Sequence, residues 1–319
     1  MKYLITGGAG FIGSACAKAL MARGDECILI DNFNDYYDQT LKTDRIEQFL
    51  KPYKNHFTLY KGDIRDSDFL NHVFTKEKPD KVLHLAAMAG VRASLENPSL
   101  YADVNVVGTT KLLECAQLNN VQNFVYASSS SVYGENAKVP FSEDDSVNHP
   151  VSPYAATKKA IEPLARTYNY VYGLKTSGLR FFTVYGPWGR PDMGVFKFPA
   201  LMIAGNPIDV YNEGKMQRNF TYIDDIVSGT LTTLDADLEC DIINIGGDTT
   251  VELIDFIETI ERKLGITATK NMLPMQKGDV VRTDADIRKL CALGWSPQTS
   301  IDEGVENFIA WYKDYYNIN

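Results

Sequence analysis

The sequence is poor in the residues that hold metal ions or build disulfide frameworks. Its 319 residues include four histidines and five cysteines, and no two cysteines stand in a C-x-x-C pair. The odd number of cysteines and their apolar surroundings predict buried free thiols in a reducing compartment. We expect no metal site, because zinc centres need clustered Cys and His ligands. The cysteines are Cys16, Cys27, Cys115, Cys240 and Cys291.

Long apolar runs and an excess of positive charge are also missing. No apolar stretch is long enough to cross a bilayer, and the opening residues MKYLITGG do not resemble a signal peptide. The formal net charge of -9 disfavours binding to phosphate backbones. We therefore expect a cytoplasmic protein with no membrane and no nucleic-acid partner. An anionic ligand would need a local cluster of Arg and Lys.

Short apolar strands alternate with helical patterns through the first half of the chain. With 45% hydrophobic residues, the chain can bury a large core. The alternation predicts an α/β fold, a Rossmann-type doubly wound parallel sheet with helices on both faces. Strands are expected at Lys2–Thr6, Glu26–Ile30, Phe57–Lys61, Lys81–Leu85 and Phe124–Ala127. Helices are expected at Phe11–Arg23, Ser67–Lys76, Ser99–Asn119 and Tyr154–Tyr172.

The pattern loosens in the second half, which predicts a smaller mixed α/β C-terminal lobe. We expect a dinucleotide-binding domain over residues 1–182, to which some later segments return, and a mainly substrate-binding lobe over 183–319. Two segments, Thr249–Glu252 and Ser300–Glu303, fit the capping box that begins a helix. Pro163 falls inside an expected helix and should bend it or remove a hydrogen bond.

A glycine-rich loop follows the first expected strand and begins the first expected helix. Its small residues let the backbone approach a pyrophosphate at the helix N-terminus. Asp31 ends the second strand, where a carboxylate accepts hydrogen bonds from ribose hydroxyls and repels a 2′-phosphate. The sequence therefore predicts a site for NAD. Cofactor contacts are expected from Gly7, Gly10, Phe11, Ile12, Gly13, Asp31 and Asn32.

The ends of the third and fourth expected strands should line the same crevice, because ligands bind at the carboxyl edge of an open parallel sheet. Asp63 and Ile64 are expected beside the adenine. Small side chains near the fourth strand let the cofactor lie against the backbone, and we expect contacts from Leu85, Ala86 and Ala87. His84 is expected to be a buried strand histidine and not a base.

Tyr154 and Lys158 form the most informative chemical pattern. A spacing of four residues places both side chains on one face of a helix. A free tyrosine has a pKa of about 10, and a neighbouring ammonium lowers it by favouring the phenolate. Four consecutive serines, Ser128–Ser131, follow the fifth strand. We expect them to face a substrate, with one hydroxyl hydrogen-bonded to the reacting group.

These motifs together resemble the extended short-chain dehydrogenase/reductase superfamily of nucleotide-sugar enzymes, over essentially the whole chain. Three further segments, Leu179–Met193, Ile208–Asn212 and Arg218–Asp225, more narrowly resemble the UDP-glucuronate 4-epimerases. Enzymes of that group interconvert UDP-glucuronate and UDP-galacturonate through transient oxidation at C4. The resemblance implies NAD as the cofactor and a UDP-sugar as the substrate.

The same resemblance implies roles for individual residues. Tyr154 would take the proton of the C4 hydroxyl, Lys158 would bind the nicotinamide ribose, and Ser129 would assist catalysis. Contacts to the sugar carboxylate are implied for Ser130, Ser131 and Thr183. Further substrate contacts are implied for Arg92, Arg190, Val195, Lys197, Tyr211, Arg218, Asp279 and Arg282. Within that set, Arg218 suits the diphosphate and Asp279 the uridine ribose.

Three alternatives stay open at this point. A 4-epimerase of the UDP-glucose or UDP-GlcNAc type usually carries Asn at the position of Thr183. A UDP-glucuronate decarboxylase usually carries Glu within the serine run. A non-catalytic NAD-sensing protein on the same fold would not need both Tyr154 and Lys158.

Relatives in this superfamily often pair through two long helices beside the sheet. The resemblance therefore implies a homodimer held by the segments Ser99–Asn119 and Tyr154–Tyr172.

Overall fold

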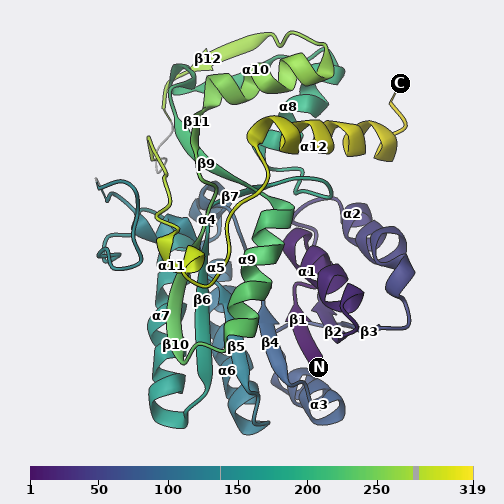
Figure 1. The fold of residues 1–319 in the computed structure, drawn as a ribbon, viewed down its shortest axis with the longest axis vertical. Coiled ribbons are helices and arrows are strands. Elements are labelled where there is room, and N and C mark those ends of the chain that lie inside the picture. Colours follow the sequence, from purple (N-terminus) through teal and green to yellow (C-terminus); the bar gives the residue numbers. More distant parts are fainter. Residues whose placement is uncertain (137, 276–279, 319) are drawn as a thin grey trace.

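A parallel sheet forms the centre of the larger, lower part of the molecule (Figure 1). The structure is a computed structural model that describes residues 1–136, 138–275 and 280–318. Within these residues the sheet has seven strands in the order β10-β6-β5-β4-β1-β2-β3. The strands are β1 (Lys2–Thr6), β2 (Glu26–Asp31), β3 (Phe57–Lys61), β4 (Lys81–His84), β5 (Asn123–Ala127), β6 (Lys175–Phe181) and β10 (Cys240–Ile245). The fold class is therefore the predicted α/β sheet of Rossmann type.

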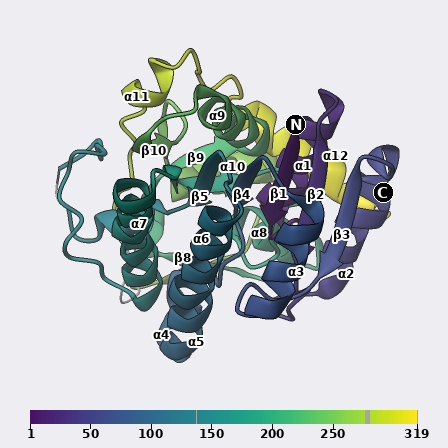
Figure 2. The same ribbon diagram turned by 90° about the horizontal axis from the view of Figure 1, so that it is seen from below.

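Helices cover both faces of this sheet (Figure 2). One face carries α1 (Phe11–Ala22) and α9 (Ile223–Ala236), and the other carries α3 (Ser67–Glu77), α6 (Thr109–Leu118) and α7 (Pro153–Tyr172). Each strand of the sheet contributes side chains to the cores on both faces, because successive side chains point to opposite faces. In β1, Tyr3 and Ile5 join the core under α1 and α9, whereas Leu4 joins the core under α3, α6 and α7.

A smaller part lies above the carboxyl edge of the sheet (Figure 1). A three-stranded sheet in the order β11-β9-β7 connects the two parts, and β8 pairs with β12 at the top. Its strands are β7 (Thr183–Tyr185), β8 (Ile208–Tyr211), β9 (Gln217–Tyr222), β11 (Thr250–Glu252) and β12 (Lys270–Leu273). Its helices are α8 (Gly194–Ile203), α10 (Leu253–Leu264) and α12 (Ile301–Tyr315). Both β10 and α9 come after β7 in the chain, but β10 pairs in the large sheet and α9 covers one of its faces. The domain boundary between residues 182 and 183 stays a prediction.

Short helical turns complete the chain at the loops. They are α2 (Gln39–Asp44), η1 (Arg45–Phe49), η2 (Lys51–Tyr53), α4 (Val91–Glu96), α5 (Pro98–Tyr101), η3 (Ala102–Gly108), η4 (Ser130–Tyr133), η5 (Asn212–Gly214) and α11 (Arg288–Cys291). Two of them, η1 and η3, are π-helical. Such wide turns are rare and are often found at functional sites.

The five predicted strands are confirmed to within one residue at each end. The helix expected over Ser99–Asn119 is instead three consecutive pieces, α5, η3 and α6. The π turn places Asn105 so that its side chain bonds both backbone groups of Met88, accepting from the amide at 2.8 Å and donating to the carbonyl at 3.0 Å. A tertiary contact therefore overrides the regular helix that the pattern predicts.

The two predicted capping boxes have different outcomes. Ser300 caps α12, and its hydroxyl accepts a hydrogen bond from the Glu303 amide at 3.3 Å. The prediction at Thr249–Glu252 is wrong, because Thr250–Glu252 form β11, which pairs antiparallel with β9. The β-branched Thr250 and Val251 favour this extended structure.

Pro163 lies inside α7, which continues from Pro153 to Tyr172 around it. All five cysteines are free thiols, and Cys16, Cys27 and Cys115 are buried as predicted. Cys291 is exposed, which corrects the prediction for that residue, because it is the last residue of the short surface helix α11.

Candidate active site

A cleft of about 450 Å³ opens at the carboxyl edge of the large sheet, below the smaller part. Strands β1, β2, β4, β5 and β6 each supply a lining residue at or directly after their last residue. The cleft is therefore at the place where open parallel sheets bind ligands. All predicted cofactor residues line it: Gly7, Gly10, Phe11, Ile12, Gly13, Asp31, Asn32, Asp63, Ile64, Leu85, Ala86, Ala87, Tyr154 and Lys158.

The glycine loop is shaped for close approach of backbone to backbone. Gly7 has φ +70°, and a Cβ on Gly13 would lie 2.1 Å from the Gly7 carbonyl oxygen. No side chain among the described residues caps the N-terminus of α1, which begins after Gly10. Its amide groups therefore face the cleft and suit a phosphate.

Asp31 holds the next loop in place at the end of β2. Its buried carboxylate accepts hydrogen bonds from the Ala9 amide at 3.1 Å and the Phe33 amide at 2.8 Å. Further along this edge, Asn32 donates to Asp63 at 3.0 Å. Hydrogen bonds from Arg65 hold the pKa of Asp63 down, at about 2. Asp63 therefore stays ionised at this edge, and a carboxylate there suits sugar hydroxyls better than an added phosphate.

Tyr154 and Lys158 lie one turn apart near the start of α7 and both line the cleft. Burial raises the pKa of Tyr154, while a hydrogen bond with Ser129 and the positive charge of Arg190 act in the opposite direction. Lys158 is buried, donates to the Ala127 carbonyl oxygen at 2.8 Å, and has a pKa lowered by burial to about 7. Arg190 is thus the cation that favours the Tyr154 phenolate, where the sequence predicted Lys158.

His84 lies below this pair, at the end of β4, and is 2% exposed. Its Nδ1 lies 2.7 Å from the Thr6 hydroxyl and its Nε2 lies 2.8 Å from the Thr109 hydroxyl. Burial, together with the charge of Lys158, lowers the pKa of His84 to about 3. The side chain is therefore a neutral structural histidine, as predicted.

The serine run lines the cleft beside Tyr154. Ser129 donates to the Ser131 hydroxyl at 3.1 Å and accepts from the Ser131 amide at 3.1 Å. Ser128 points away from this pair and donates to Glu162 at 2.8 Å. Glu162 in turn accepts two hydrogen bonds from the buried Arg180, at 2.9 and 3.0 Å.

This buried pair fixes the ionisation state beneath the serines. Burial pushes the pKa of Glu162 up, but the hydrogen bonds and charge of Arg180 outweigh it, so the pKa is lowered. Glu162 is therefore a carboxylate held by Arg180 and not a proton donor for chemistry in the cleft.

Arg190 enters the cleft from the loop after β7. It donates to both oxygens of Asp192, at 3.0 and 2.5 Å, and stacks over the ring of Tyr36 at 5.4 Å. Tyr36 comes from the loop after β2, so the contact joins the two sides of the cleft. Thr183, Ser130 and Ser131 line the same space.

Of the remaining predicted substrate residues, those that the structure describes do not line the cleft. Arg92 stacks over the Tyr211 ring at 5.1 Å, and Arg218 donates to the carbonyl of Val281, next to Arg282. Lys197 is exposed on α8. Val195 is buried in the core, which leaves its backbone and not its side chain for a ligand. Asp279 lies outside the described residues.

Several cleft residues were not predicted. Asp192 lies within the segment Leu179–Met193 but was given no role, and the others carry no motif: Asn34, Tyr36, Tyr37, Lys42 and Met88. Most belong to loops that directly follow β2 and β4. Their one sequence signal is this position after a strand, since such loops lie at the ligand-binding edge of a parallel sheet.

The residues that the structure describes contain neither a metal-binding cluster nor a membrane-spanning helix. Within residues 1–136, 138–275 and 280–318, no three His, Cys, Asp or Glu side chains are grouped to hold a metal ion. No helix in the same ranges is long and apolar enough to span a bilayer.

Comparisons with known proteins agree with this geometry. A family model described as GDP-mannose 4,6 dehydratase matches residues 4–308. Protein CapI of Staphylococcus aureus is 47% identical, over 99% of each chain. UDP-glucuronate 4-epimerase 4 of Arabidopsis thaliana is 45% identical over 98% of this chain and 76% of its own length.

A solved structure shows how far the similarity extends in three dimensions. The UDP-glucuronic acid 4-epimerase of Bacillus cereus, in complex with UDP-glucuronic acid and NAD, has a TM-score of 0.93 at 36% identity, and the match covers 99% of this chain and 100% of that one. The fold and the dinucleotide cleft define a nucleotide-sugar enzyme of the extended short-chain dehydrogenase/reductase class. Within that class, the chain belongs to the family of the GDP-mannose 4,6 dehydratase model.

Proposed function

We propose that this protein is an NAD-dependent UDP-glucuronate 4-epimerase, which interconverts UDP-glucuronate and UDP-galacturonate. The observation that carries the proposal is a single cleft in which Tyr154, Lys158, Thr183 and the serines Ser129–Ser131 meet. The similarity to 4-epimerases of the same substrate in Arabidopsis thaliana and Bacillus cereus supports it.

The cleft fits NAD through the chemistry of its walls. The glycine loop and the open N-terminus of α1 suit the pyrophosphate, and Asp31 with Asn32 suits the adenosine ribose. Asp63 and Ile64 would border the adenine, and the segment Leu85–Ala87 would lie along the nicotinamide half. When bound, NAD supplies a reversible two-electron oxidation at C4 of the sugar.

The chain's own residues would then move one proton. Tyr154 is proposed as the base for the C4 hydroxyl, with Ser129 bonded to it and Lys158 placed one turn below. The contact with Ser129 and the charge of Arg190 both favour the phenolate against the effect of burial. A base with a pKa nearer to neutral transfers protons more effectively.

Hydroxyl groups are proposed to protect the substrate carboxylate. Oxidation at C4 creates a ketone β to that carboxylate, and such acids lose carbon dioxide when the breaking bond aligns with the carbonyl. Ser130, Ser131 and Thr183 would hold the carboxylate out of that alignment, an effect of orientation. No acid interrupts Ser128–Ser131, and Glu162 beneath them is bound to Arg180. We infer that this keeps the reaction at epimerisation.

The uridine diphosphate would extend from the cleft toward β8 and β9. Arg92 stacks over Tyr211 of β8, and Arg218 lies on β9, whose first residue, Gln217, pairs with Arg282. We propose Arg218 and Arg282 for the diphosphate, because guanidinium forks suit phosphate oxygens. Val195 and Lys197 would contribute from α8, and Asp279 would hold the uridine ribose.

Product analysis tests the proposal most directly. The purified protein is incubated with UDP-glucuronate without added cofactor, and the products are separated by chromatography and identified by NMR. We expect UDP-galacturonate and no net change in redox state. Mostly UDP-pentose would identify a decarboxylase instead, and turnover of UDP-glucose alone a neutral-hexose epimerase. Bound NAD without turnover of any UDP-sugar would support a sensing protein.

A homodimer and a cytoplasmic location complete the proposal. The helices expected to pair, α6 and α7, lie side by side on one face of the sheet (Figure 2). Five free thiols suit a reducing compartment.

A further inference from the structure

Arg45 is a buried cation in the second layer of the cleft, at the first residue of the π-helical turn η1. Its side chain is 0% exposed. Among the described residues it forms no ion pair, and its hydrogen bonds go to neutral oxygens: the carbonyls of Ala9, Trp188 and Gly189, and the phenol of Tyr37. A buried charge is costly unless its hydrogen bonds are satisfied, so this position has a specific use.

These hydrogen bonds join the two loops on which the site depends. One guanidinium nitrogen donates to Ala9 of the glycine loop at 3.1 Å and to Tyr37 at 2.7 Å. The other nitrogens donate to Trp188 at 2.7 and 3.1 Å and to Gly189 at 3.1 Å. Gly189 directly precedes Arg190. The cofactor loop and the loop that carries Arg190 are therefore held by one side chain.

The second loop is also held in an uncommon shape. Trp188 has φ +63°, a backbone conformation that bulky residues rarely adopt. Its ring contacts Phe49, Trp311 and Tyr315, at centroid distances of 5.5, 5.4 and 5.2 Å. Two hydrogen bonds from Arg45 hold its carbonyl in this conformation.

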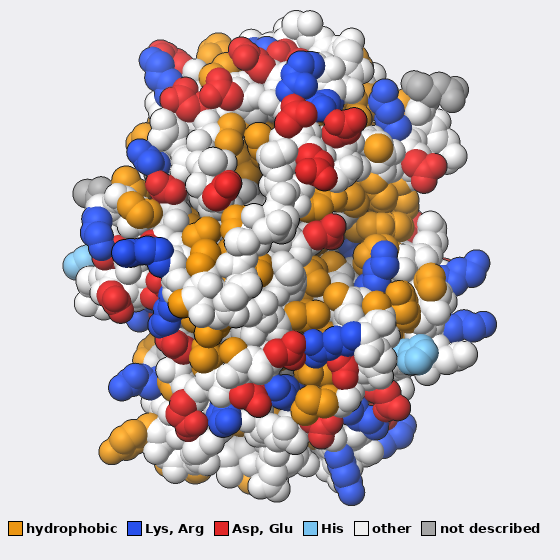
Figure 3. Space-filling model, in the orientation of Figure 1, with side chains coloured by type: hydrophobic (Ala, Val, Ile, Leu, Met, Phe, Trp, Pro, Cys, Tyr) orange, Lys and Arg blue, Asp and Glu red, His pale blue; other side chains and the backbone are white. Residues whose placement is uncertain are grey.

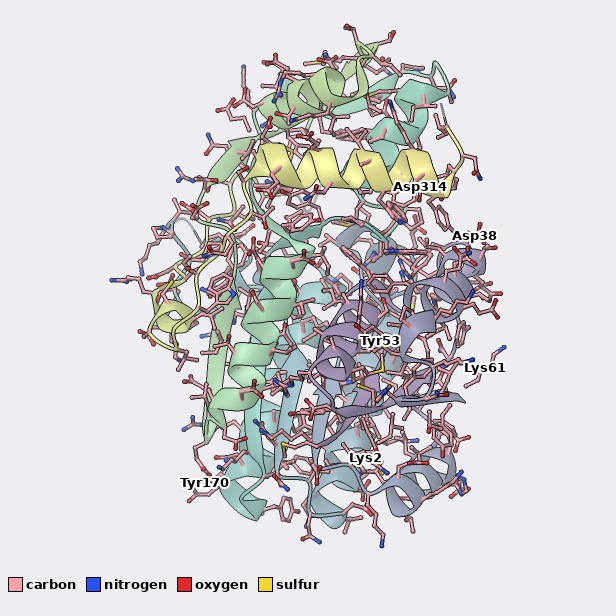
Figure 4. The ribbon with its side chains drawn as sticks, turned by 45° about the vertical axis from the view of Figure 1, so that its right-hand side comes forward. Lys2, Asp38, Tyr53, Lys61, Tyr170 and Asp314 are labelled. Carbon is pink, nitrogen blue, oxygen red and sulfur yellow. The ribbon has the colours of Figure 1, made fainter. Side chains whose placement is uncertain are left out.

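The surroundings place Arg45 where the two parts of the molecule meet. The Tyr315 hydroxyl of α12 donates to Asp44, the residue before Arg45. Figure 4 shows Asp38, before α2, and Asp314, in α12, close together on this side. Figure 3 shows hydrophobic side chains gathered on this face below α12 and beside α2. A Cβ built on Gly189 would lie 3.9 Å from the ring of Phe11, the first residue of α1, so the Trp188–Gly189 backbone lies near the start of α1.

We propose that Arg45 is a positioning residue that couples the binding of NAD to the binding of the UDP-sugar. Ordering of the glycine loop by the dinucleotide fixes Ala9 and, through Arg45, the Trp188–Gly189 backbone and the direction of Arg190. Filling either site then favours the other by the same factor, as binding equilibria require. The inference rests on the proposed function, because it takes NAD and UDP as the two ligands.

Lysine at this position should break the coupling while keeping the charge. An ammonium cannot reach three carbonyls and a phenol with the fixed geometry of a guanidinium fork. The experiment uses the full chain after its bound NAD has been removed, and measures the NAD dissociation constant by calorimetry, with and without saturating UDP. In the wild type we expect UDP to tighten NAD binding about tenfold, within the usual range of such couplings. The coupling ratio is the NAD dissociation constant without UDP divided by the constant with UDP. In Arg45→Lys we expect this ratio to fall below about threefold.

Two further variants make the result decisive. Val73→Ala is the matched control, because Val73 is a buried residue of α3, on the opposite face of the sheet from α1. It should lower stability and leave the ratio at the wild-type value. Tyr37→Phe removes only one acceptor of Arg45 and should lower the ratio in part, and it decides the matter if Arg45→Lys does not fold.

The possible failures are distinguishable. If folded Arg45→Lys keeps the wild-type ratio, or if wild-type protein binds NAD and UDP independently, the coupling by Arg45 is disproved. Product analysis with UDP-glucuronate would then still decide the epimerase function by itself. A wild-type chain that binds neither NAD nor UDP would overturn both proposals.

Discussion

At the scale of single residues, the site contains ionisable groups whose burial opposes their charged forms. Burial raises the pKa of Tyr154 and lowers the pKa of Lys158 to about 7. Each shift favours the neutral group, whereas the proposed chemistry needs a phenolate. The nearby Ser129 hydroxyl and Arg190 charge act against burial at Tyr154. Ionisation of the phenol is therefore a property of several side chains and not of the Tyr-Lys spacing alone.

Replacing Tyr154 by Phe tests the role of the phenol. Tyr154→Phe keeps the ring and loses the hydroxyl, so we expect NAD to stay bound and turnover of UDP-glucuronate to fall by roughly 10²–10⁴-fold, the usual contribution of a general base. Turnover is measured by chromatography, and bound NAD is measured after denaturation. Tyr168→Phe, on the same helix, is the control and should keep full activity. A Tyr154→Phe variant near the wild-type rate would remove Tyr154 as the base.

The lowered pKa of Lys158 predicts a dependence of stability on pH. Its ordinary value is 10.5 and its folded value is about 7, so between these values the unfolded chain holds more protons than the folded chain. The destabilisation from its buried charge is thus complete below pH 7 and disappears as pH rises toward 10.5. Relative to Lys158→Met, the NAD-free wild type should gain roughly 2 kcal/mol in unfolding free energy from pH 7 to pH 9.

Urea unfolding at the two pH values measures this difference. Lys61→Met is the control, because Lys61 is exposed at the end of β3, at the edge of the sheet (Figure 4). It should follow the wild type at both pH values. Equal pH dependence of wild type and Lys158→Met would show that Lys158 is not a buried ammonium.

The sequence identifies the residues that carry chemistry better than the residues that support them. Tyr154, Asp31 and the serines stand in motifs whose spacing has a physical reason. Arg45 and Lys42 stand in no such motif. Arg45 donates to Trp188, which is far away in the chain, and Lys42 donates to Asn34 across the turn before α2. Such residues are found only when the fold brings the loops together.

At the scale of elements, a short sequence motif predicts a helix or strand correctly only where the tertiary contacts of that segment favour the same structure. Ser300 caps α12, but Thr250 enters β11 because β9 offers a partner strand. The same motif therefore has two outcomes, decided by pairing over a long distance. In η3, the contacts of Asn105 with Met88 likewise replace a regular helical turn with a π turn.

This difference between the two segments predicts different costs of mutation. Ser300→Ala should lower the unfolding free energy by about 1 kcal/mol, because it removes the acceptor for a helix-start amide. Thr249→Ala should change it by less than about 0.5 kcal/mol, because no cap exists there to lose. Urea unfolding of both variants at one pH is the measurement. Equal losses in both would mean that α10 also begins with a working cap.

At the scale of the whole molecule, the parallel sheet with helices on both faces and the place of the cleft follow from the sequence, whereas the joining of the two parts does not. Alternating strands and helices allow few arrangements of a parallel sheet. The return of β10 to the sheet edge and the packing of α12 against α8 and α10 depend on contacts across long stretches of chain. The pattern of one segment does not encode them.

The exposed apolar residues near α6 and α7 predict how two chains would meet. Val107 and Leu118 are 44% and 63% exposed, and Tyr170 is 89% exposed where α7 projects from the end of the molecule (Figure 4). Apolar side chains gathered on one face suit an interface.

We expect the wild type to sediment at twice the mass of the 35.7 kDa chain. The double variant Val107→Glu with Leu118→Glu should sediment as a monomer, because pairing would bury four carboxylates in each dimer. Met272→Glu is the control, since Met272 is 49% exposed on β12, in the other part of the molecule, and should leave the dimer intact. Sedimentation velocity at several concentrations distinguishes these cases. A wild type that stays monomeric would show that the chains do not pair. A double variant that stays dimeric would show that they pair through another face.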